Sequence, residues 1–166
     1  SNNGSPFFFQ SRPGKNGKVF KIVKFKTMND KRDNESKLLP DAQRITAVGK
    51  FIRKTSLDEI PQLINVVKGD MSLVGPRPLL PDYVHLYSEY QNQRHQVLPG
   101  ITGYVQVKGR NTLTWEERFD LDVYYVQHIS FIFDCKILFL TFITLFVFNK
   151  SRPQKGISIE PFEGQW

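Results

Sequence analysis

Cysteine is almost absent from the chain, whose 166 residues include only Cys135. A single cysteine excludes a disulfide within the chain and any cysteine-rich zinc site, so the composition fits a reducing compartment without proving one. Zinc binding by histidine is also disfavoured, because His85, His95 and His128 have no metal-ligand spacing among them. Cys135 itself is expected to be a small buried residue and not a nucleophile.

Long apolar segments and the common nucleotide-binding motifs are missing as well. The longest uncharged apolar run, residues 137–148, has 12 residues, whereas a helix that spans a bilayer needs about 20. The first residues show no signal-peptide pattern. No Walker loop, no G-x-G-x-x-G after a strand and no G-x-S-x-G motif occurs, which disfavours the common nucleotide-binding and hydrolase folds. We therefore expect no helix that crosses a membrane.

Basic residues are in excess, since 23 Lys and Arg against 16 Asp and Glu give a formal net charge of +7. Such a charge favours an anionic partner, which can be nucleic acid, acidic lipid or a phosphorylated substrate. Nucleic-acid binding is supported by this charge and by the basic run 18–26, but no groove-reading or base-stacking motif accompanies them. We expect no nucleic-acid partner, and salt-dependent retention on DNA would test that alternative.

The order of helix and strand signals indicates an α+β fold, with one compact domain over residues 1–150 and an irregular tail over 151–166. Pro13-Gly14 and Asn16-Gly17 separate two β-rich runs and predict an N-terminal β-hairpin. Helical spacing predicts helices over 41–54, 57–68, 81–96, 114–128 and 137–148. Short strands are predicted at 71–74 and 104–107, and a polar loop at 29–37. Some of these helices are expected to form a flat face at a membrane.

Asp58 and Glu59 are the acids best placed for chemistry, because they stand together at a predicted helix start. There the helix dipole favours an ionised carboxylate, and free backbone N–H groups can bind phosphate oxygens. An ionised carboxylate beside a bound phosphate can act as a nucleophile. The alternative is structural, since Ser56 and Glu59 also form a capping-box pattern, although Pro61 would then lie beyond the first turn at a cost to the helix.

A carboxylate and a phosphate repel each other, so such a site also needs positive charge from side chains or from a divalent metal. Four basic residues lie in loops or near the ends of predicted elements, namely Lys24, Arg53, Arg77 and Arg110. Each of them alone is more often a solvated charge. Their placement together with the two acids therefore decides whether they form a site.

Several short segments follow one another in a characteristic order, namely Lys24–Met28, Ser56–Gln62, Gly69–Ser72, Gly75–Pro78, Arg94–His95, Pro99–Gly103 and Gly109–Asn111. In sequence and spacing these segments resemble the bacterial sugar transferase family, the monotopic phosphoglycosyl transferases. The resemblance runs from about Gly4 to about Lys150. It is nearest to the small transferases that begin bacterial N-glycan assembly.

The resemblance implies a two-step transfer of a sugar 1-phosphate from a UDP-sugar to polyprenol phosphate, expected to be undecaprenyl phosphate. Asp58 would attack the β-phosphate, release UMP and hold the phosphosugar as an aspartyl intermediate. Mg²⁺ would bind at Asp58, and Glu59 would assist the nucleophile or proton movements. The other residues expected at the site, four cations and a supporting acid, are Lys24, Arg53, Arg77, Arg110 and Asp134. An acetamido sugar is the expected substrate, and the reaction would open glycoconjugate assembly.

Members of that family act at the cytoplasmic face of the bacterial inner membrane and carry an apolar N-terminal helix that dips into the bilayer. This chain begins with the polar residues 1–5, so we expect that anchor to be absent. The apolar segment 137–148 would then either pack in the core or hold the domain at the membrane interface. The chief alternative is an inactive membrane-surface scaffold of the same fold, which a phosphosugar adduct on Asp58 would exclude.

Overall fold

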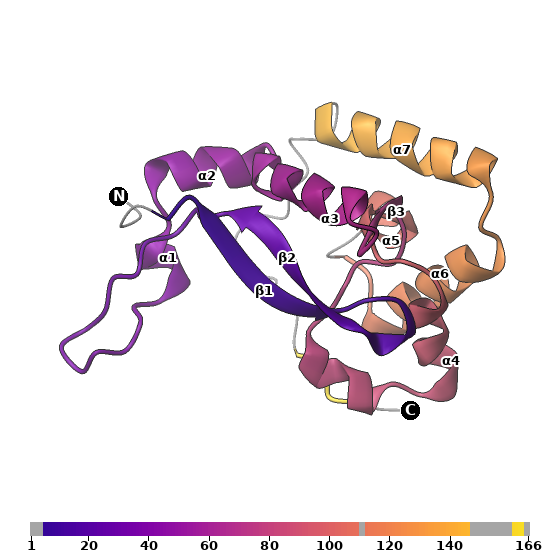
Figure 1. The fold of residues 1–166 in the computed structure, drawn as a ribbon, viewed down its shortest axis with the longest axis horizontal. Coiled ribbons are helices and arrows are strands. Elements are labelled where there is room, and N and C mark those ends of the chain that lie inside the picture. Colours follow the sequence, from indigo (N-terminus) through magenta and orange to yellow (C-terminus); the bar gives the residue numbers. More distant parts are fainter. Residues whose placement is uncertain (1–4, 110–111, 147–160, 165–166) are drawn as a thin grey trace. The chain divides into compact units, whose positions relative to one another are not determined.

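The hairpin predicted near the N-terminus is present. The structure, a computed structural model, describes residues 5–109, 112–146 and 161–164. Strands β1 (Phe7–Pro13) and β2 (Val19–Phe25) pair with each other and are joined through the 3₁₀ turn η1 (Lys15–Gly17) (Figure 1). Asn16 and Gly17 have φ values of 55° and 73°, the left-handed conformation that an Asn-Gly step adopts readily.

The chain forms two compact units, and the hairpin contributes its open end to one and its tip to the other. Unit 1 comprises residues 1–10 and 21–65, and unit 2 comprises 11–20 and 66–166. After the hairpin, unit 1 contains α1 (Asp41–Arg44), α2 (Ala47–Lys54), the 3₁₀ helix η2 (Leu57–Gln62) and most of α3 (Leu63–Val67). Unit 2 contains β3 (Ser72–Val74), η3 (Pro81–Leu86), α4 (Glu89–Asn92), η4 (Gln93–Gln96), β4 (Gly100–Thr102), α5 (Tyr104–Lys108), α6 (Trp115–Gln127) and α7 (Phe131–Phe146). The predicted α+β fold is confirmed, and the single domain over 1–150 stays a prediction.

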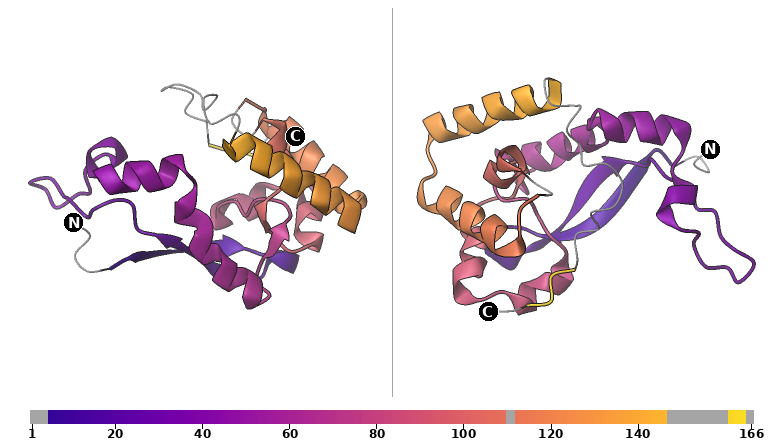
Figure 2. Two further views of the ribbon diagram at one scale, coloured as in Figure 1. Left: turned by 90° about the horizontal axis from the view of Figure 1, so that it is seen from above. Right: turned by 180° about the vertical axis from the view of Figure 1, so that it is seen from behind.

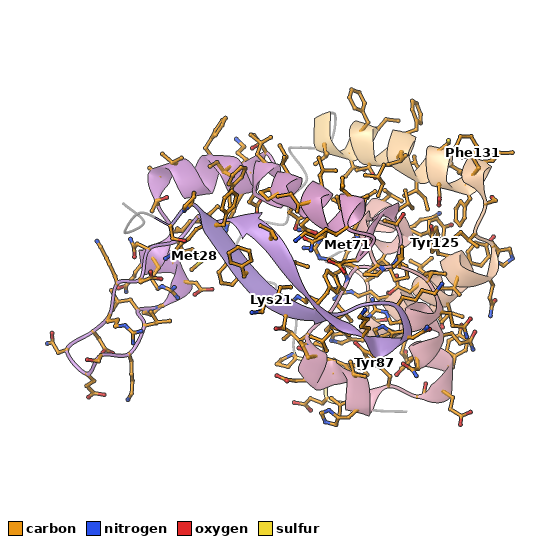
Figure 3. The ribbon with its side chains drawn as sticks, in the orientation of Figure 1. Lys21, Met28, Met71, Tyr87, Tyr125 and Phe131 are labelled. Carbon is orange, nitrogen blue, oxygen red and sulfur yellow. The ribbon has the colours of Figure 1, made fainter. Side chains whose placement is uncertain are left out.

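In unit 1, the prediction of one helix over 41–54 is wrong. Ile45 has an extended backbone that ends α1 and forms a bridge with Met28. The Thr46 hydroxyl then accepts the Gly49 N–H and opens α2 as its N-cap. Gly49 lies so close to the hairpin's exit that a Cβ there would overlap the carbonyl of Thr27. Tertiary contact with the segment around Met28, which Figure 3 labels, therefore interrupts the helical pattern.

The helix predicted over 57–68 divides into η2 and α3. Pro61 lies inside η2, where its ring disfavours the α conformation of the preceding residue and its missing N–H removes a helix bond. Gly69, with φ 79°, follows the last turn and ends the helical segment as predicted. The polar loop over 29–37 is confirmed as irregular, although a bridge between Arg32 and Leu38 closes it.

In unit 2, a parallel pair of short strands stands where two glycine-rich segments meet. Residues 72 and 74 of β3 pair with residues 100 and 102 of β4. A Cβ on Gly100 or on Gly103 would overlap the backbone of Gly75, so this approach requires glycine. The strand predicted at 104–107 is wrong, because these residues form α5. The alternating Tyr-Val-Gln-Val pattern suits a strand, but here it places Val105 in the interior from a short helix.

The remaining helices of unit 2 follow the sequence signals in part. The capping box at Thr114 is confirmed, since its hydroxyl accepts the Glu117 N–H at 3.2 Å and the Glu117 carboxylate accepts the Thr114 N–H at 2.7 Å. The helix predicted over 81–96 is wrong, because η3, α4 and η4 replace it. The apolar helix begins six residues earlier than predicted, as α7, and it packs against α5, β3 and β4. Figure 2 shows α7 as the orange-to-yellow helix.

Two clusters of side chains lie in the interior of unit 2. The first consists of Val74, Tyr125 and Ile137, with less buried neighbours at Val97, Tyr104, Val107 and Phe133. The second is aromatic and consists of Tyr83, Tyr87, Trp115, Phe119 and Phe162, whose ring centroids lie 5.1–6.0 Å apart in the pairs that touch. Phe162 belongs to the segment predicted as an irregular tail, yet it is buried. The tail therefore contributes to the interior of unit 2, which its Pro and Gly content did not indicate.

The exposed side chains of α7 correct one expectation, whereas contact of this helix with a membrane stays a prediction. Cys135 is exposed on α7, so its predicted burial is wrong. Figure 3 shows Phe131, which is 84% exposed, at the outer end of α7, whereas Tyr125 of α6 lies inside unit 2. Within residues 5–109, 112–146 and 161–164, no helix has both the length and the apolar character needed to span a bilayer.

Candidate active site

Asp58 and Glu59 lie in the first turn of η2, directly after a left-handed residue. Ser56 has φ 58° and makes no side-chain cap hydrogen bond, so the predicted capping box is wrong. The Glu59 N–H instead donates to the carbonyl oxygen of Ser56 at 3.2 Å, which tightens the turn. This bond uses the Glu59 backbone, and the Glu59 side chain has a separate partner in Lys24.

Lys24 of β2 approaches this turn from the hairpin. Its Nζ donates to Oε1 of Glu59 at 2.9 Å, and the two side chains are 19% and 16% exposed. Both residues belong to unit 1 although they stand 35 positions apart. The structure therefore brings together a cation and an acid that the sequence analysis expected at one site.

Asp58 is half-buried, and its surroundings disfavour its charge. Burial raises the pKa of the Asp58 carboxyl above its usual value, and the negative charge of Glu59 raises it further. Lys24 and Arg53 act in the opposite direction, as does a backbone hydrogen bond. A cation that binds next to this carboxylate would stabilise its ionised form. Carboxylates whose pKa is shifted by burial and by a like charge are typical of sites that bind charged ligands.

Arg53 extends this group at the end of α2. Its Nε donates to the hydroxyl of Thr27 at 2.8 Å, and its Nη2 lies 2.9 Å from the sulfur of Met28. Thr27 is itself buried, and its carbonyl oxygen accepts the Thr46 N–H at 3.2 Å. The guanidinium is thus held on the chain that follows β2, within electrostatic range of Asp58.

The donor set fits a magnesium ion that shares its ligands with a substrate. Among the described residues, no group of three or more His, Cys, Asp or Glu side chains could enclose a metal. Mg²⁺ commonly takes one or two carboxylates, and substrate phosphates and water complete its six ligands. The Asp58 carboxylate, whose pKa is raised by burial and by Glu59, is a suitable protein ligand for such an ion.

The other predicted site residues belong to unit 2, and the structure describes two of them. Arg77 follows the Gly-Pro turn after β3; its carbonyl oxygen accepts from Nη2 of Arg94 at 2.7 Å. Its charge adds to burial in lowering the pKa of Arg12. Asp134, in the first turn of α7, accepts a hydrogen bond from the Tyr125 hydroxyl at 2.8 Å. Arg110 lies outside the described residues.

Two residues near these groups were missed by the sequence analysis. Asn65 is a lone polar residue in the apolar run of α3, and that isolation was a usable signal. Tyr125 is 1% exposed and donates toward both Asp134 and the Val74 carbonyl oxygen, at 2.8 and 3.3 Å. Nothing in the sequence around Tyr125 distinguishes it from an ordinary core residue.

Comparison with known proteins adds a family and several relatives. The family model for bacterial sugar transferases matches residues 1–148. An uncharacterized sugar transferase, EpsL of Bacillus subtilis (strain 168), is 54% identical over 162 residues, which cover 97% of this chain and 80% of that protein. The galactosyl transferase CpsE of Streptococcus agalactiae serotype III (strain NEM316) is 43% identical over 152 residues, or 83% of this chain and 34% of that protein.

A further relative is the UDP-glucose:undecaprenyl-phosphate glucose-1-phosphate transferase of Escherichia coli (strain K12). It is 43% identical over 164 residues, which cover 91% of this chain and 34% of that protein. The chain is thus similar to most of the length of EpsL and to about a third of the two longer relatives.

Proposed function

Because this chain belongs to the bacterial sugar transferase family, we propose that it transfers a sugar 1-phosphate from a UDP-sugar to polyprenol phosphate, with Asp58 as nucleophile. The observation that carries this proposal is the group in unit 1, where the Lys24–Glu59 ion pair stands beside the half-buried Asp58 carboxyl. The name of the E. coli relative, which states transfer of glucose 1-phosphate from UDP-glucose to undecaprenyl phosphate, supports the class of donor and acceptor. The reaction would be the first membrane step of glycoconjugate assembly.

In the first half-reaction, a carboxylate oxygen of Asp58 attacks the β-phosphorus of the UDP-sugar. A bond forms between that oxygen and phosphorus, and the bond from the β-phosphorus to the bridging oxygen breaks. UMP leaves with the bridging oxygen, and the sugar phosphate stays on Asp58 as an acyl phosphate. Glu59, which accepts a hydrogen bond from Lys24, is the next residue in the chain, and its proposed role is to assist the nucleophile.

In the second half-reaction, an oxygen of polyprenol phosphate attacks the same phosphorus. The bond between phosphorus and the Asp58 oxygen breaks, which restores the carboxylate and produces a polyprenyl diphosphate sugar. Both half-reactions transfer a group that carries negative charge, so both need cations near Asp58. Lys24 and Arg53 supply such charge within unit 1, and Arg77 and Arg110 are the further cations we propose for phosphate groups, with Asp134 as a supporting acid.

Mg²⁺ is the cofactor we propose, with the Asp58 carboxylate as its protein ligand. When bound, the ion supplies positive charge to phosphate oxygens and so favours attack by an anion. The chain's own part is to present the half-buried Asp58 carboxylate in the first turn of η2, and to hold the Lys24 ammonium at Glu59.

The surface of unit 1 supports a membrane partner, proposed as the cytoplasmic face of the bacterial inner membrane. Within unit 1, α2, η2 and the first residues of α3 expose large apolar side chains, namely Val48, Phe51, Leu57, Ile60, Leu63 and Ile64. The same helices expose Lys50 and Lys54. Apolar side chains flanked by lysines suit the boundary between acyl chains and anionic headgroups. A nucleophile on such a surface could react with a lipid-linked acceptor at the boundary between membrane and water.

The sugar proposed is an acetamido sugar, while two relatives carry names that state galactose or glucose transfer. The deciding experiment measures the intact mass of the protein after incubation with Mg²⁺ and separate UDP-sugars, both acetamido and plain hexose. A sugar-phosphate increment is expected on the native chain and is expected to be lost in Asp58→Asn. Addition of undecaprenyl phosphate in detergent should then remove the increment and yield the lipid product.

Other outcomes would contradict the proposal in distinct ways. If Asp58→Asn makes lipid product at the native rate, Asp58 is not the nucleophile. If no UDP-sugar gives an increment or a lipid product, an inactive scaffold that keeps the fold is the better interpretation. If plain hexoses react and acetamido sugars do not, the transferase proposal stands and the sugar proposal fails.

A further inference from the structure

Asn65 makes an unusual contact between a helix and a strand edge in unit 1. It is 2% exposed, and its side-chain amide faces the backbone of β2. Its Nδ2 donates to the carbonyl oxygen of Lys21 at 2.8 Å, and its Oδ1 accepts from the N–H of Val23 at 3.2 Å. Residues two apart on a strand direct their backbone groups to the same edge, so one carboxamide can satisfy both. The amide thus takes the place that a third strand would occupy beside β2.

This contact joins the two chain segments that carry the candidate site. Lys24 follows Val23 directly on β2, and Figure 3 labels Lys21 on the same strand. Asp58 and Glu59 lie in η2, which continues into α3 without a break at Leu63. A displacement of α3 along or away from β2 would therefore also displace Glu59 from Lys24.

We propose that Asn65 is a positioning residue of this site, which fixes α3 on β2 and thereby holds Lys24 at the Asp58–Glu59 pair. The inference rests on the proposed function for its catalytic meaning, while the contact itself is independent of it. The Lys24–Glu59 bond is 2.9 Å long, and a charge-assisted bond of this length is lost with a movement of about 1 Å. Misplacement of that size can reduce a catalysed rate by about 100-fold.

The residue type at position 65 is as informative as its contact. An alanine would leave the buried N–H of Val23 and the part-buried carbonyl of Lys21 without the amide that now pairs with them. An aspartate has nearly the same shape and could accept from Val23, but it has no donor for the Lys21 carbonyl oxygen. Asn65→Asp therefore separates the need for both hydrogen bonds from the need for a side chain of this size.

The test compares rates of adduct formation on Asp58 in Asn65→Ala, Lys24→Met and the double variant, below the unfolding temperature of each. If Asn65 acts through Lys24, the two effects will not multiply: Asn65→Ala should lower the rate at least 10-fold, and the double variant should be no slower than Lys24→Met within about threefold. Multiplied effects, or a native rate in Asn65→Ala, would overturn the proposal. Asn65→Asp is expected to be slow as well, and a native rate there would show that the bond to Lys21 is not needed.

A readout that does not depend on activity is the hydrogen exchange of the Val23 amide. Loss of the Asn65 acceptor should speed this exchange in Asn65→Ala, while the amides of α6 keep their native protection. Unchanged protection at Val23 would refute the contact. Gln91→Ala is the matched control, because Gln91 is a buried amide of unit 2 that caps α4, and its loss should leave adduct formation unchanged. If the native chain forms no adduct, the proposed function fails, and the exchange result still decides the contact.

Discussion

Units 1 and 2 each contain an ion pair of nearly the same length in very different surroundings. Lys24 and Glu59 in unit 1 are 2.9 Å apart and partly exposed, whereas Arg94 and Asp122 in unit 2 are 2.8 Å apart and only 3% and 6% exposed. Arg94 also donates to the Arg77 carbonyl oxygen and to the Tyr87 hydroxyl, at 2.7 and 3.3 Å. The N–O distance of an ion pair therefore does not by itself indicate the role of that pair.

The surroundings suit the two pairs to different tasks. Burial raises the pKa of Asp122 to about 6 even though Arg94 opposes this, so desolvation costs more than the pair recovers. Arg94 also lies over the rings of Tyr87 and Phe119, which surround it with protein. The partly exposed Lys24–Glu59 pair is open to competition from an incoming phosphate. The buried Arg94–Asp122 pair therefore serves the fold of unit 2, whereas the accessible Lys24–Glu59 pair can take part in binding.

The largest difference between the two ion pairs is expected when one partner of the buried pair is removed. Asp122→Ala leaves the Arg94 charge buried without its carboxylate, and we expect a loss of about 3–5 kcal/mol in the free energy of unfolding. Thermal or denaturant unfolding followed by circular dichroism measures it. Glu59→Ala is the comparison, and its loss should stay below about 1 kcal/mol because the pair is partly exposed.

The pH dependence of the free energy of unfolding is a second test of the buried Arg94–Asp122 pair. The folded-state pKa of Asp122 lies above the usual value of about 3.9, so the folded chain binds this proton more tightly. Its contribution to stability therefore falls as the pH rises from about 4 to about 6. Asp122→Asn should lack that slope, and an identical slope in both proteins would contradict the assignment.

Truncation of Phe162 tests whether the C-terminal segment belongs to unit 2. Phe162→Ala removes a buried ring from the aromatic cluster, and we expect a loss of about 3 kcal/mol in the free energy of unfolding. Urea unfolding followed by tryptophan fluorescence would report it, since Trp115 lies 5.5 Å from Phe162 between ring centroids. Native stability would show that this segment does not need to be docked.

Changes at the accessible pair should alter activity more than stability. Glu59→Gln removes a negative charge that raises the pKa of Asp58, so the acid limb of the pH–rate profile should shift to lower pH. Lys24→Met removes a charge that lowers this pKa, so its acid limb should shift to higher pH. We expect the rate of Glu59→Gln at neutral pH to fall by about 100-fold, as for other acid–base groups. Shifts of the same sign in both variants would refute this assignment.

The smallest expected effect is a gain in stability. Asp58→Asn removes a carboxylate whose pKa is raised by burial and by Glu59, so the folded state no longer bears the cost of ionising it at neutral pH. An unfolding midpoint about 1–3 °C higher is expected, while adduct formation is lost. A lower midpoint would show that the Asp58 charge is stabilised by the fold, contrary to its raised pKa.

Local signals predicted the elements whose cause is local. The Asn16-Gly17 step placed the hairpin turn, and Thr114 with Glu117 placed the start of α6, because each depends on residues that are neighbours in sequence. The family resemblance, confirmed by the matching family model, selected Asp58 and Glu59 from among many acids. Periodicity failed where distant chain intervened, as at Ile45, which bridges Met28, and at Tyr104, where a helix replaced the predicted strand.

The sequence by itself determined the α+β class, the hairpin, the capped helix and the family, because turn chemistry, capping and ordered motifs are encoded within short stretches. Only the tertiary structure decided that Lys24 meets Glu59, that Asn65 fastens α3 to β2, and that Phe162 is buried. Each of these contacts joins residues 35 or more positions apart or depends on burial by other segments. The pattern of residues along the chain does not indicate which distant residues will pair, because the fold of the backbone decides which of them come within hydrogen-bond distance.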